Sequence, residues 1–331
     1  MAPQVDHLEK ENALKILYAT ESNKVVGIAP FRKTRKSLKA KFGYNIIEPL
    51  TTGNTDYTGI ILAEQETRCL SKFLTYLFNQ EDWDLLYFPD LPQTSPTLDA
   101  IKRIHTSLPR FEIKKGIICP YISVPDSKEK LLANLSRKFQ RELNRRLRKL
   151  EKEQGIVELK PYYELGSLEQ AMKILFRIHQ KRWALDGDSG SFNRPEARKI
   201  AVQQANLFSE RGWFRLYFLT VNNRPVAAEI NLEYGRKRYA SYCGFDPDYS
   251  KYSVGSLLML KVLEECIEKG VSEYDLMQGA EPYKFCWTNR FRQNMNVRFV
   301  NKKLSANIVC VVLRALHMSK FCIRNIFPKL M

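Results

Sequence analysis

The sequence predicts a mixed α/β (α+β) fold that is divided into two lobes. Segments typical of strands alternate with segments typical of helices, and hairpins among the strands favour a mixed sheet over a purely parallel one. A chain of 331 residues, 44% of them hydrophobic, can bury one large core or two medium ones. At this length two lobes are the more common arrangement, and a long basic helix is predicted between them.

The first lobe is predicted over residues 1–125. Leu14–Thr20 and Lys24–Phe31 are expected to form a hairpin, because Ser22-Asn23 offers the turn chemistry that such a connection needs. No acid/base cluster is found in this lobe, so its expected task is to shape one wall of a cleft. Further strands are expected at Tyr57–Leu62, Leu85–Phe88 and Phe111–Val124, with helices at Thr67–Asn79 and Ser95–Ser107. A basic run is interpreted as a charged hairpin loop: Arg32, Lys33, Arg35, Lys36, Lys39 and Lys41.

One long amphipathic helix is predicted over residues 126–154, with a capping-box-like start at Asp126 and Glu129. Its apolar face recurs at three- and four-residue spacing: Leu131, Leu135, Phe139, Leu143, Leu147 and Leu150. Its other face is strongly basic: Arg137, Lys138, Arg141, Arg145, Arg146, Arg148 and Lys149. Three interpretations remain open for this face, namely a solvated surface, attraction of an acidic substrate, or nucleic-acid binding.

The second lobe is predicted over residues 155–304. It is expected to hold strands at Val157–Tyr163, Trp213–Val221, Pro225–Tyr234, Arg238–Phe245, Glu273–Leu276 and Val297–Val300, and helices at Leu168–Leu185, Pro195–Glu210 and Leu257–Lys269. The last of these helices ends with a basic residue followed by Gly270, which is typical of a helix C-terminus.

Composition excludes several classes of protein. Residues 1–15 carry charges and no apolar run, which is unlike a signal peptide, and we expect a cytoplasmic protein. Seven cysteines without a CxxC pair disfavour a disulfide framework or a zinc site, so no metal is expected. The basic residues of the 32–41 and 137–149 segments account for much of the net charge of +17. Five cysteines among apolar neighbours are interpreted as reduced packing residues: Cys69, Cys119, Cys243, Cys266 and Cys286.

Residues 305–331 combine apolar and basic residues, but the uninterrupted apolar stretch is too short to span a bilayer. Two interpretations remain open. The segment is either a helix docked on the core, or a basic amphipathic helix that lies on a membrane surface or a partner. The second alternative would make the protein peripheral to the membrane.

The turn before the helix at Leu257–Lys269 is a candidate anion site. The start of a helix leaves backbone N–H groups unpaired, and the helix dipole attracts negative charge there. Gly255 would let a phosphate approach the backbone closely. The alternative is an ordinary helix cap. The candidate cofactor-binding residues are Lys251, Tyr252, Ser253, Val254, Gly255 and Ser256.

From His179 to Trp287 the chain carries a series of short motifs in a characteristic order. They are His179-Gln-Lys-Arg182-Trp183, Gly212-Trp213, Arg224-Pro225-Val226-Ala227-Ala228, Gly244-Phe245-Asp246-Pro247-Asp248-Tyr249, Tyr252-Ser253-Val254-Gly255, Tyr274-Asp275, Gly279, Glu281-Pro282-Tyr283-Lys284 and Trp287. This series resembles the GNAT-related acetyltransferase domain of proteins associated with cellulose and other exopolysaccharide biosynthesis, a relative of the Fem-type aminoacyl transferases. Val26 to Phe31 extends the resemblance weakly into the first half.

The resemblance implies tandem GNAT-like lobes with mixed sheets over most of residues 12–303. It also implies that Arg238–Phe245 and Glu273–Leu276 splay apart to admit the acyl-carrying arm of acetyl-CoA, while the Lys251–Ser256 turn receives its pyrophosphate. The turn departs from the best-known GNAT phosphate signature, because it holds only one glycine.

Acyl transfer needs a base, donors for the oxyanion and an acid for the departing thiolate. The candidate bases are Glu229, His179 and Asp275. The structural alternatives are an outward strand residue for Glu229 and a hydrogen-bonding role for His179. The resemblance implies that Tyr283 protonates the thiolate, with Lys284 beside it; the alternative is a packed tyrosine and a lysine paired with Asp275. The candidate substrate-binding residues are Arg182, Trp183, Tyr242, Gly279 and Trp287, and the two tryptophans would more often pack than bind.

The leading hypothesis is an acyl-CoA-dependent N- or O-acyltransferase that acetylates a sugar, amino sugar or amine without a covalent intermediate. One alternative is a Fem-like aminoacyl transferase that uses charged tRNA, which the basic helix would bind through phosphate contacts. Another is a catalytically silent scaffold for an acidic or membrane partner.

Overall fold

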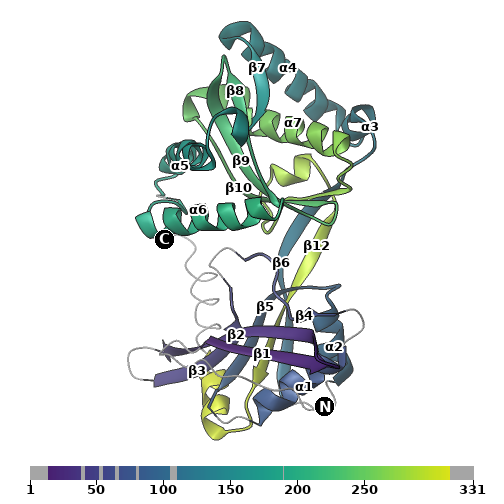
Figure 1. Ribbon diagram of the computed structural model, residues 1–331, viewed down its shortest axis with the longest axis vertical. Coiled ribbons are helices and arrows are strands. Elements are labelled where there is room, and N and C mark those ends of the chain that lie inside the picture. The colour runs from purple at the N-terminus through teal and green to yellow at the C-terminus, as the bar shows by residue number, and fades with distance from the viewer. Residues whose placement is uncertain are drawn as a thin grey trace, which may run out of the picture. The chain divides into compact units, whose positions relative to one another are not determined.

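The computed structural model describes residues 14–38, 42–51, 55–63, 67–79, 82–104, 110–188 and 190–313. The chain divides into two compact units (Figure 1). Unit 1 consists of residues 1–118 and 292–331, and unit 2 is the continuous segment 119–291. Unit 1 is therefore built from two separate stretches of chain. The predicted C-terminal lobe, residues 155–304, extends beyond the end of unit 2 at residue 291.

Unit 1 is a mixed sheet that is packed against helices. Its strands lie in the order β1-β2-β3-β5-β12-β6, and β4 pairs with β2. The strands are β1 (Leu14–Glu21), β2 (Lys24–Leu38), β3 (Phe42–Pro49), β4 (Ile61–Leu62), β5 (Leu85–Pro92), β6 (Phe111–Ser123) and β12 (Phe291–Val300), and the helices are α1 (Thr67–Phe78) and α2 (Pro96–Ile104). The hairpin at Ser22-Asn23 is confirmed, since both residues adopt positive φ between β1 and β2.

Three expectations for this unit were wrong. The basic run is not a loop, because Arg32, Lys33, Arg35 and Lys36 lie within β2 and pair with β3; Lys39 and Lys41 are outside the described residues. β3 was missed altogether. The strand expected at Tyr57–Leu62 shrinks to the two residues of β4. Arg32 and Lys36 of β2 form ion pairs with the buried Glu48 of β3. These pairs stabilise the basic run as a strand, which its composition did not indicate.

β12 belongs to unit 1 because it completes that unit's core. It pairs antiparallel with β5, and Val297 and Phe299 are fully buried among the side chains of β1, β2, β5 and α1. The ring of Phe299 contacts Phe78, Phe88 and Phe111. The helical residues 304–313 also pack here, through Ala306, Val309 and Cys310.

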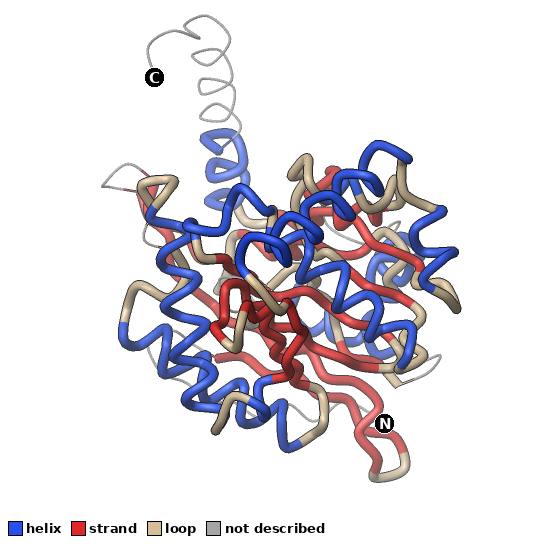
Figure 2. Tube along the Cα trace, turned by 90° about the horizontal axis from the view of Figure 1, so that it is seen from above, coloured by secondary structure: helices blue, strands red, loops and turns tan. Residues whose placement is uncertain are grey.

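Unit 2 is a second mixed sheet, covered by helices on both faces (Figures 1 and 2). Its strands follow the order β6-β11-β10-β9-β8-β7. The strands are β7 (Val157–Pro161), β8 (Phe214–Val221), β9 (Arg224–Tyr234), β10 (Lys237–Phe245) and β11 (Glu273–Asp275), and the helices are α3 (Lys128–Ala133), α4 (Arg137–Gln154), α5 (Leu168–Ala184), α6 (Pro195–Glu210) and α7 (Val254–Glu268). Short 3-10 turns are η2 (Tyr162–Glu164), η3 (Pro247–Tyr252) and η4 (Lys284–Cys286).

The two faces of this sheet bury different helices because successive strand residues point to opposite sides. In β8, Tyr217 and Leu219 join the core beneath α3, α4 and α7. Their neighbours Leu216 and Phe218 join the core beneath α5 and α6. We call these sides the α7 face and the α5 face. The predicted mixed α/β class is confirmed.

The single helix predicted over residues 126–154 is two helices. Ser127 caps α3 by accepting a hydrogen bond from the Lys130 N–H, and Ser136 caps α4 by accepting one from the Phe139 N–H. Asp126 pairs with Lys130 at 2.7 Å instead of acting as the cap. The break arises because a serine that competes for backbone donors starts a new helix.

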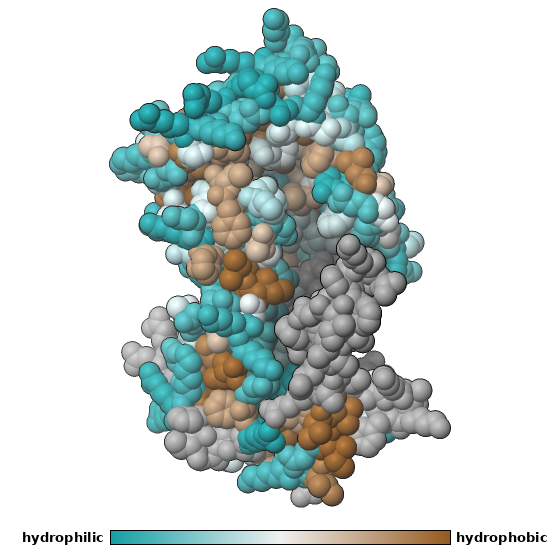
Figure 3. All heavy atoms as spheres, turned by 180° about the vertical axis from the view of Figure 1, so that it is seen from behind, coloured by the Kyte–Doolittle hydropathy of each residue, from teal (hydrophilic) through white to brown (hydrophobic). Residues whose placement is uncertain are grey.

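The apolar face predicted for this region is confirmed, since Leu131, Leu135, Leu143 and Leu150 are buried in the core of the α7 face. The opposite side of α4 is hydrophilic, as is the end of unit 2 on which α4 lies (Figure 3). Both α3 and α4 lie within unit 2, so they do not form a link between the units.

Residues 304–313 form a helix docked on unit 1, which confirms that alternative for the start of the 305–331 segment. Residues 314–331 lie outside the described part of the chain. Within the described residues, no helix combines the length and apolar character needed to cross a membrane.

Candidate functional site

A divergence of two strands marks the candidate site in unit 2. β10 pairs in parallel with β11 over Lys237–Tyr239, and with β9 over the whole of Lys237–Phe245. Among the strand pairs of the described residues, the second half of β10 therefore pairs with β9 and not with β11. A bulge between Ala240 and Tyr242 leaves Ser241 outside the ladder. The expected divergence of these two strands is thus present, and its open edge begins beside Asp275.

The turn that follows β10 ends at an uncapped helix. Asp246 caps η3, and Ser253 then adopts a left-handed conformation, with φ 54° and ψ 44°, that redirects the chain into α7. The Ser253 side chain caps nothing, and its carbonyl accepts the N–H groups of Ser256 and Leu257. Within the described residues, the N–H groups of Val254 and Gly255 make no hydrogen bond. Two free donors thus lie at the positive end of α7.

The six predicted cofactor-binding residues do not all face outward. Tyr252 is buried, and its hydroxyl donates to Glu153 of α4 at 2.7 Å. Lys251 lies over the Tyr252 ring and pairs with the same carboxylate at 3.3 Å. Val254 is buried in the core. These three residues fix the turn to α4. Gly255 keeps open space, because a Cβ there would only meet Phe245 at 3.7 Å.

Glu229 is the one candidate base buried on the α7 face. It is 3% exposed, lies opposite Cys243 in the register, and accepts a hydrogen bond from the Tyr274 hydroxyl. Burial raises the pKa of its carboxyl, while Tyr274, Asn231 and Arg238 act in the opposite direction. The alternative that Glu229 points outward from its strand is therefore wrong.

Cys243 and Tyr283 lie together beside Glu229. The Cys243 sulfur reaches solvent, yet the protein groups crowded around it raise its pKa to about 11, with Glu229 as the main charge. Tyr283 is 45% exposed, and its pKa is raised by burial and then by Cys243, Glu281 and Glu229. Glu229, Cys243 and Tyr283 thus lie close enough to affect one another's pKa values. Cys243 and Cys286 are exposed, so interpreting them as packing residues was wrong.

The loop after β11 is held by Lys284. This side chain is 4% exposed, donates to the carbonyls of Met277 and Gln278, and pairs with Glu281 at 3.0 Å. Gly279 is required here, since its φ of 118° is left-handed and a Cβ would meet the Glu281 carboxylate. The buried Asp275 accepts from the Met277 N–H at 2.8 Å. These contacts give Lys284, Gly279 and Asp275 parts in shaping the loop that carries Tyr283.

His179 and its neighbours lie on the α5 face. The His179 Nε2 accepts a hydrogen bond from the Trp183 indole at 2.9 Å, and the ring packs against Phe192 and Tyr242. Burial, and secondly Arg182, lower the pKa of His179 to about 4. Since Tyr242 and Cys243 are adjacent in β10, they point to opposite faces, and His179 is separated from Glu229 by the sheet.

Two further predicted residues have contrasting positions. Arg182 pairs with Asp186 at 2.6 Å and lies 5.4 Å from the ring of Phe245, on the second half of β10. Trp287 is 3% exposed and packs edge-on against Phe139 of α4, so it is a core residue. Within the described residues, no group of three His, Cys, Asp or Glu side chains is placed to hold a metal ion.

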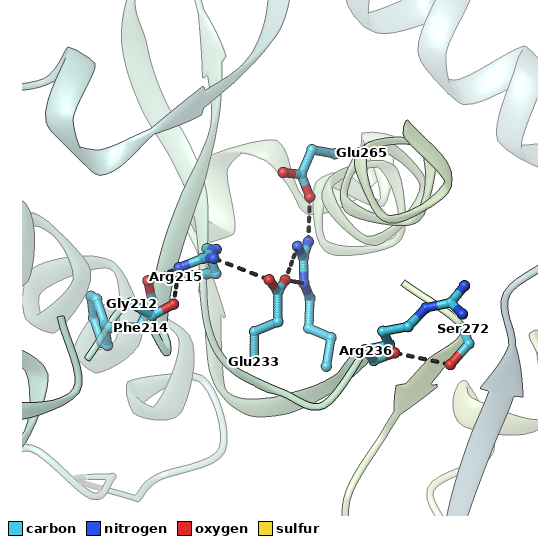
Figure 4. Close-up of polar contacts among 8 residues, drawn as sticks. Gly212, Phe214, Arg215, Glu233, Arg236, Glu265 and Ser272 are labelled. Atoms are coloured by element: carbon cyan, nitrogen blue, oxygen red, sulfur yellow. Dashed lines mark hydrogen bonds and ion pairs between the residues drawn. The ribbon is translucent and has the colours of Figure 1, made fainter. Parts of the chain in front are cut away.

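A buried ion-pair cluster went unnoticed in the sequence. Arg238 of β10 is 0% exposed and pairs with Glu233 of β9 and Glu265 of α7; its guanidinium also lies 5.4 Å from the Tyr217 ring. Figure 4 shows Glu265 reaching towards this cluster from α7, while Arg215 binds Glu233 from the other side at 3.0 Å. The cluster ties α7 to the strand that flanks the divergence. The sequence around Arg238, which precedes a tyrosine in its strand, gives no indication that the arginine side chain is buried.

Comparison with known proteins gives a family match that covers this part of unit 2. Residues 137–285 match the acetyltransferase (GNAT) domain family. The matched segment starts with α4 and ends in η4, so it contains the diverging strands, the turn before α7 and Glu229. No curated protein matches the chain.

Several solved structures are similar over both units. FemX is 10% identical and superimposes with a TM-score of 0.61 over 87% of this chain and 88% of its own. L-PGS from Bacillus licheniformis is 12% identical, with a TM-score of 0.56 over 90% of this chain and 88% of that one. The C-terminal domain of a putative lysylphosphatidylglycerol synthetase from Agrobacterium fabrum is 10% identical, with a TM-score of 0.54 over 92% and 88%.

At these identities the similarity establishes the fold. The chain has a GNAT-like fold, and its resemblance to Fem-type structures, drawn from short motifs, is confirmed at that level.

Proposed function

We propose that the protein is an acyltransferase that carries an acyl group, most simply acetyl from acetyl-CoA, to a sugar, amino sugar or amine. The observation that carries this proposal is the uncapped start of α7 beside the open edge of β10. The free N–H groups of Val254 and Gly255 would bind the pyrophosphate, and the pantetheine arm would lie along the half of β10 that β11 does not pair with. The family match over residues 137–285 supports the same chemistry.

The Ser241 bulge would bring a backbone N–H towards the thioester carbonyl, where the oxyanion develops. The acceptor then attacks that carbonyl directly, and the carbon–sulfur bond breaks as the tetrahedral intermediate collapses. Proximity provides much of the rate increase, so no protein nucleophile is needed. Cys243 fits this view, since a thiol with a raised pKa is a poor nucleophile.

Glu229 and Tyr283 suit proton handling. The raised pKa of Glu229 makes it a better proton acceptor than an ordinary carboxylate, and it would receive the acceptor's proton through groups next to Cys243. The raised pKa of Tyr283 keeps its hydroxyl protonated but makes it a weaker acid, so it would stabilise the departing thiolate by donating a hydrogen bond. Asp275, Lys284 and Gly279 would keep this loop in place. Arg182 and Tyr242 lie on the α5 face with His179, so they would not border an acceptor held beside Glu229.

Calorimetric titration with acetyl-CoA tests the proposal. Wild-type protein should bind, and Gly255→Glu should not, because its carboxylate would repel the pyrophosphate at the helix start. The control is Asn206→Glu, which places the same charge on the exposed surface of α6. Equal binding by all three proteins, or binding by none, would contradict an acyl-CoA site at this turn.

The structural similarity to FemX and the basic face of α4 favour a second candidate, aminoacyl transfer from charged tRNA. Lys138 and Arg148 are exposed cations of α4 that could contact phosphates. Charged tRNA should then bind with strong salt dependence, and Lys138→Gln/Arg148→Gln should weaken it, while acetyl-CoA should not bind. A scaffold without turnover would instead keep its partner after Glu229, Tyr283 and Lys284 are replaced together. A link to exopolysaccharide synthesis or to membrane contact through residues 305–331 belongs to these proposals.

A further inference from the structure

A hollow of about 740 Å³ lies between α5 and α6, and the donor turn does not contribute to it. Five cations line it, together with a single carboxylate: Lys173, Arg177, Lys181, Arg198, Lys199 and Glu169. Phe176 and Val202 supply apolar surface between them. The volume is in the range of sites that hold small organic ligands.

The cations on α5 repel one another along one stripe. Lys173, Arg177 and Lys181 follow at four-residue intervals, which places like charges next to each other on the helix surface. The ends of the stripe are neutralised within the protein, because Glu169 pairs with Lys173 at 2.8 Å and Asp246 pairs with Lys181 at 2.9 Å. Arg177 in the middle has no such counter-charge.

The unpaired charges lie on both walls of the groove. Within the described residues, Arg177 on α5 and Lys199 on α6 are exposed and form no hydrogen bond or ion pair. Arg198 is half-buried and held by a hydrogen bond from its Nε to the Phe192 carbonyl at 2.7 Å, which leaves the rest of its guanidinium for a ligand. A planar arginine fork and a lysine point charge on facing helices are the groups that bind phosphate oxygens.

We propose that this groove binds a multiply charged, phosphate-bearing ligand, independently of the donor turn. The phosphate groups would lie between Arg177, Arg198 and Lys199. A less polar part would lie on Phe176, whose ring is held rigid by contact with Phe192 at 4.7 Å.

The groove is connected to the donor turn by one ion pair. Lys181 lines the groove, and its partner Asp246 caps η3, the turn that leads into α7. Arg224 is a second cation on the same carboxylate, at 3.6 Å. Asp246 would therefore remain paired if a ligand drew Lys181 away, and the donor turn would stay capped. Occupation of the groove does not require the donor turn to rearrange.

Binding of inorganic pyrophosphate tests the proposal. It is measured by calorimetry at low and at moderate salt, in protein that carries Gly255→Glu so that the proposed donor turn cannot bind the probe. In this background the groove variant Arg177→Gln/Lys199→Gln should bind about tenfold more weakly than the parent, since each lost contact is a charge-assisted hydrogen bond. The matched control Arg103→Gln/Lys115→Gln removes the same charge from exposed positions on unit 1 and should bind like the parent. Because the parent lacks the donor site, a failure of the groove site is distinguished from a failure of the proposed donor site.

Equal weakening in the groove variant and the unit 1 control would overturn the proposal, because it would reflect only general attraction by a basic protein. A second experiment distinguishes the source of the phosphate. Vesicles with phosphatidylglycerol that retain wild type but not the groove variant would assign the ligand to a lipid headgroup, whereas pyrophosphate binding without vesicle binding would assign it to a soluble phosphate ester. No loss of either in the groove variant would contradict both.

Discussion

Glu229 and His179 are two buried titratable residues on opposite faces of the same sheet, and their surroundings push their pKa values in opposite directions. Glu229 lies on the α7 face among polar groups, receives a hydrogen bond from Tyr274, and lies opposite Cys243 in the strand register. His179 lies on the α5 face between aromatic rings, and in the described part of the chain its side-chain hydrogen-bond partner is Trp183. Burial keeps each group neutral over a wider pH range than usual. The two residues differ in their access to a proton. Glu229 has polar neighbours through which a proton can pass, whereas His179 is packed between aromatic rings.

The largest expected effect that separates the two residues is on catalysis. Glu229→Gln should lower the rate of acyl transfer by about a hundredfold or more, because a general base contributes that much. His179→Gln should change the rate little. The measurement is the release of coenzyme A from acetyl-CoA in the presence of a panel of amino sugars and amines. A similar loss in both variants, or a larger loss in His179→Gln, would contradict the assignment of Glu229 as the base and His179 as a packed residue.

The next largest effect is the pH dependence of stability. The folded-state pKa of His179 is lowered from 6.5 to about 4, so its contribution is fully present above 6.5 and is lost as the pH falls through about 4. This loss amounts to at most roughly 3 kcal/mol in the free energy of unfolding. Denaturant unfolding of wild type and His179→Gln between pH 7.5 and 4 should show the wild type losing more.

Glu229 should show the opposite sign. Its pKa is raised above 4.5 in the folded state, so the stability linked to its bound proton is present below 4.5 and is lost as the pH rises through the raised value. Relative to wild type, Glu229→Gln should therefore gain stability from pH 4 to pH 8. If both variants shift in the same direction with pH, then the contrast between the two faces is wrong.

A smaller effect concerns the contact that seats α5 on the sheet. A Cβ at Gly244 would come within 2.8 Å of the His179 Cα, so Gly244→Ala must push α5 away from β10. We expect a loss of about 2 kcal/mol in the free energy of unfolding. Gly255→Ala is the matched control, since its Cβ meets only Phe245 at 3.7 Å. Thermal unfolding of both variants gives the comparison, and a stable Gly244→Ala would show that the helix has room to move.

The smallest expected effect tests the break between α3 and α4. Ser136→Ala should lower the free energy of unfolding by about 1 kcal/mol, because the Phe139 N–H loses its cap. Ser136→Asp should retain the stability, as aspartate also caps helices. An unchanged or more stable alanine variant would favour the continuous helix that the leucine spacing predicted.

The sequence predicts the elements of unit 2 well because their patterns are local. The bounds of α6 agree with prediction, and α5 differs only by one residue at its end. α3 and α4 were merged because the leucine spacing continues through Ser136, and a cap is visible only when its hydrogen bond is seen. In unit 1, β3 was missed because its partner β2 is basic, and only the pairing with Glu48 explains why those residues form a strand.

The candidate site was predicted in outline and not in detail. The turn before α7 and the divergent strands follow from residues close together in the chain. The separation of His179 from Glu229 depends on the bulge after Ala240, because the bulge determines which face of the sheet each later residue of β10 points to. The amino-acid composition of β10 gives no indication of this bulge. The same bulge places Cys243 opposite Glu229. Arg238 was missed because its two carboxylate partners come from β9 and α7.

The route of the chain has a consequence for synthesis on the ribosome. Unit 2 is one continuous stretch, whereas the core of unit 1 needs Val297 and Phe299, which are translated after all of unit 2. During vectorial synthesis the segment 119–291 can therefore fold first, while the earlier strands still lack the one that fills the place between β5 and β6. The β1 to β5 region must wait with an open sheet edge, and this interval is when the nascent chain is most exposed to aggregation and to chaperones.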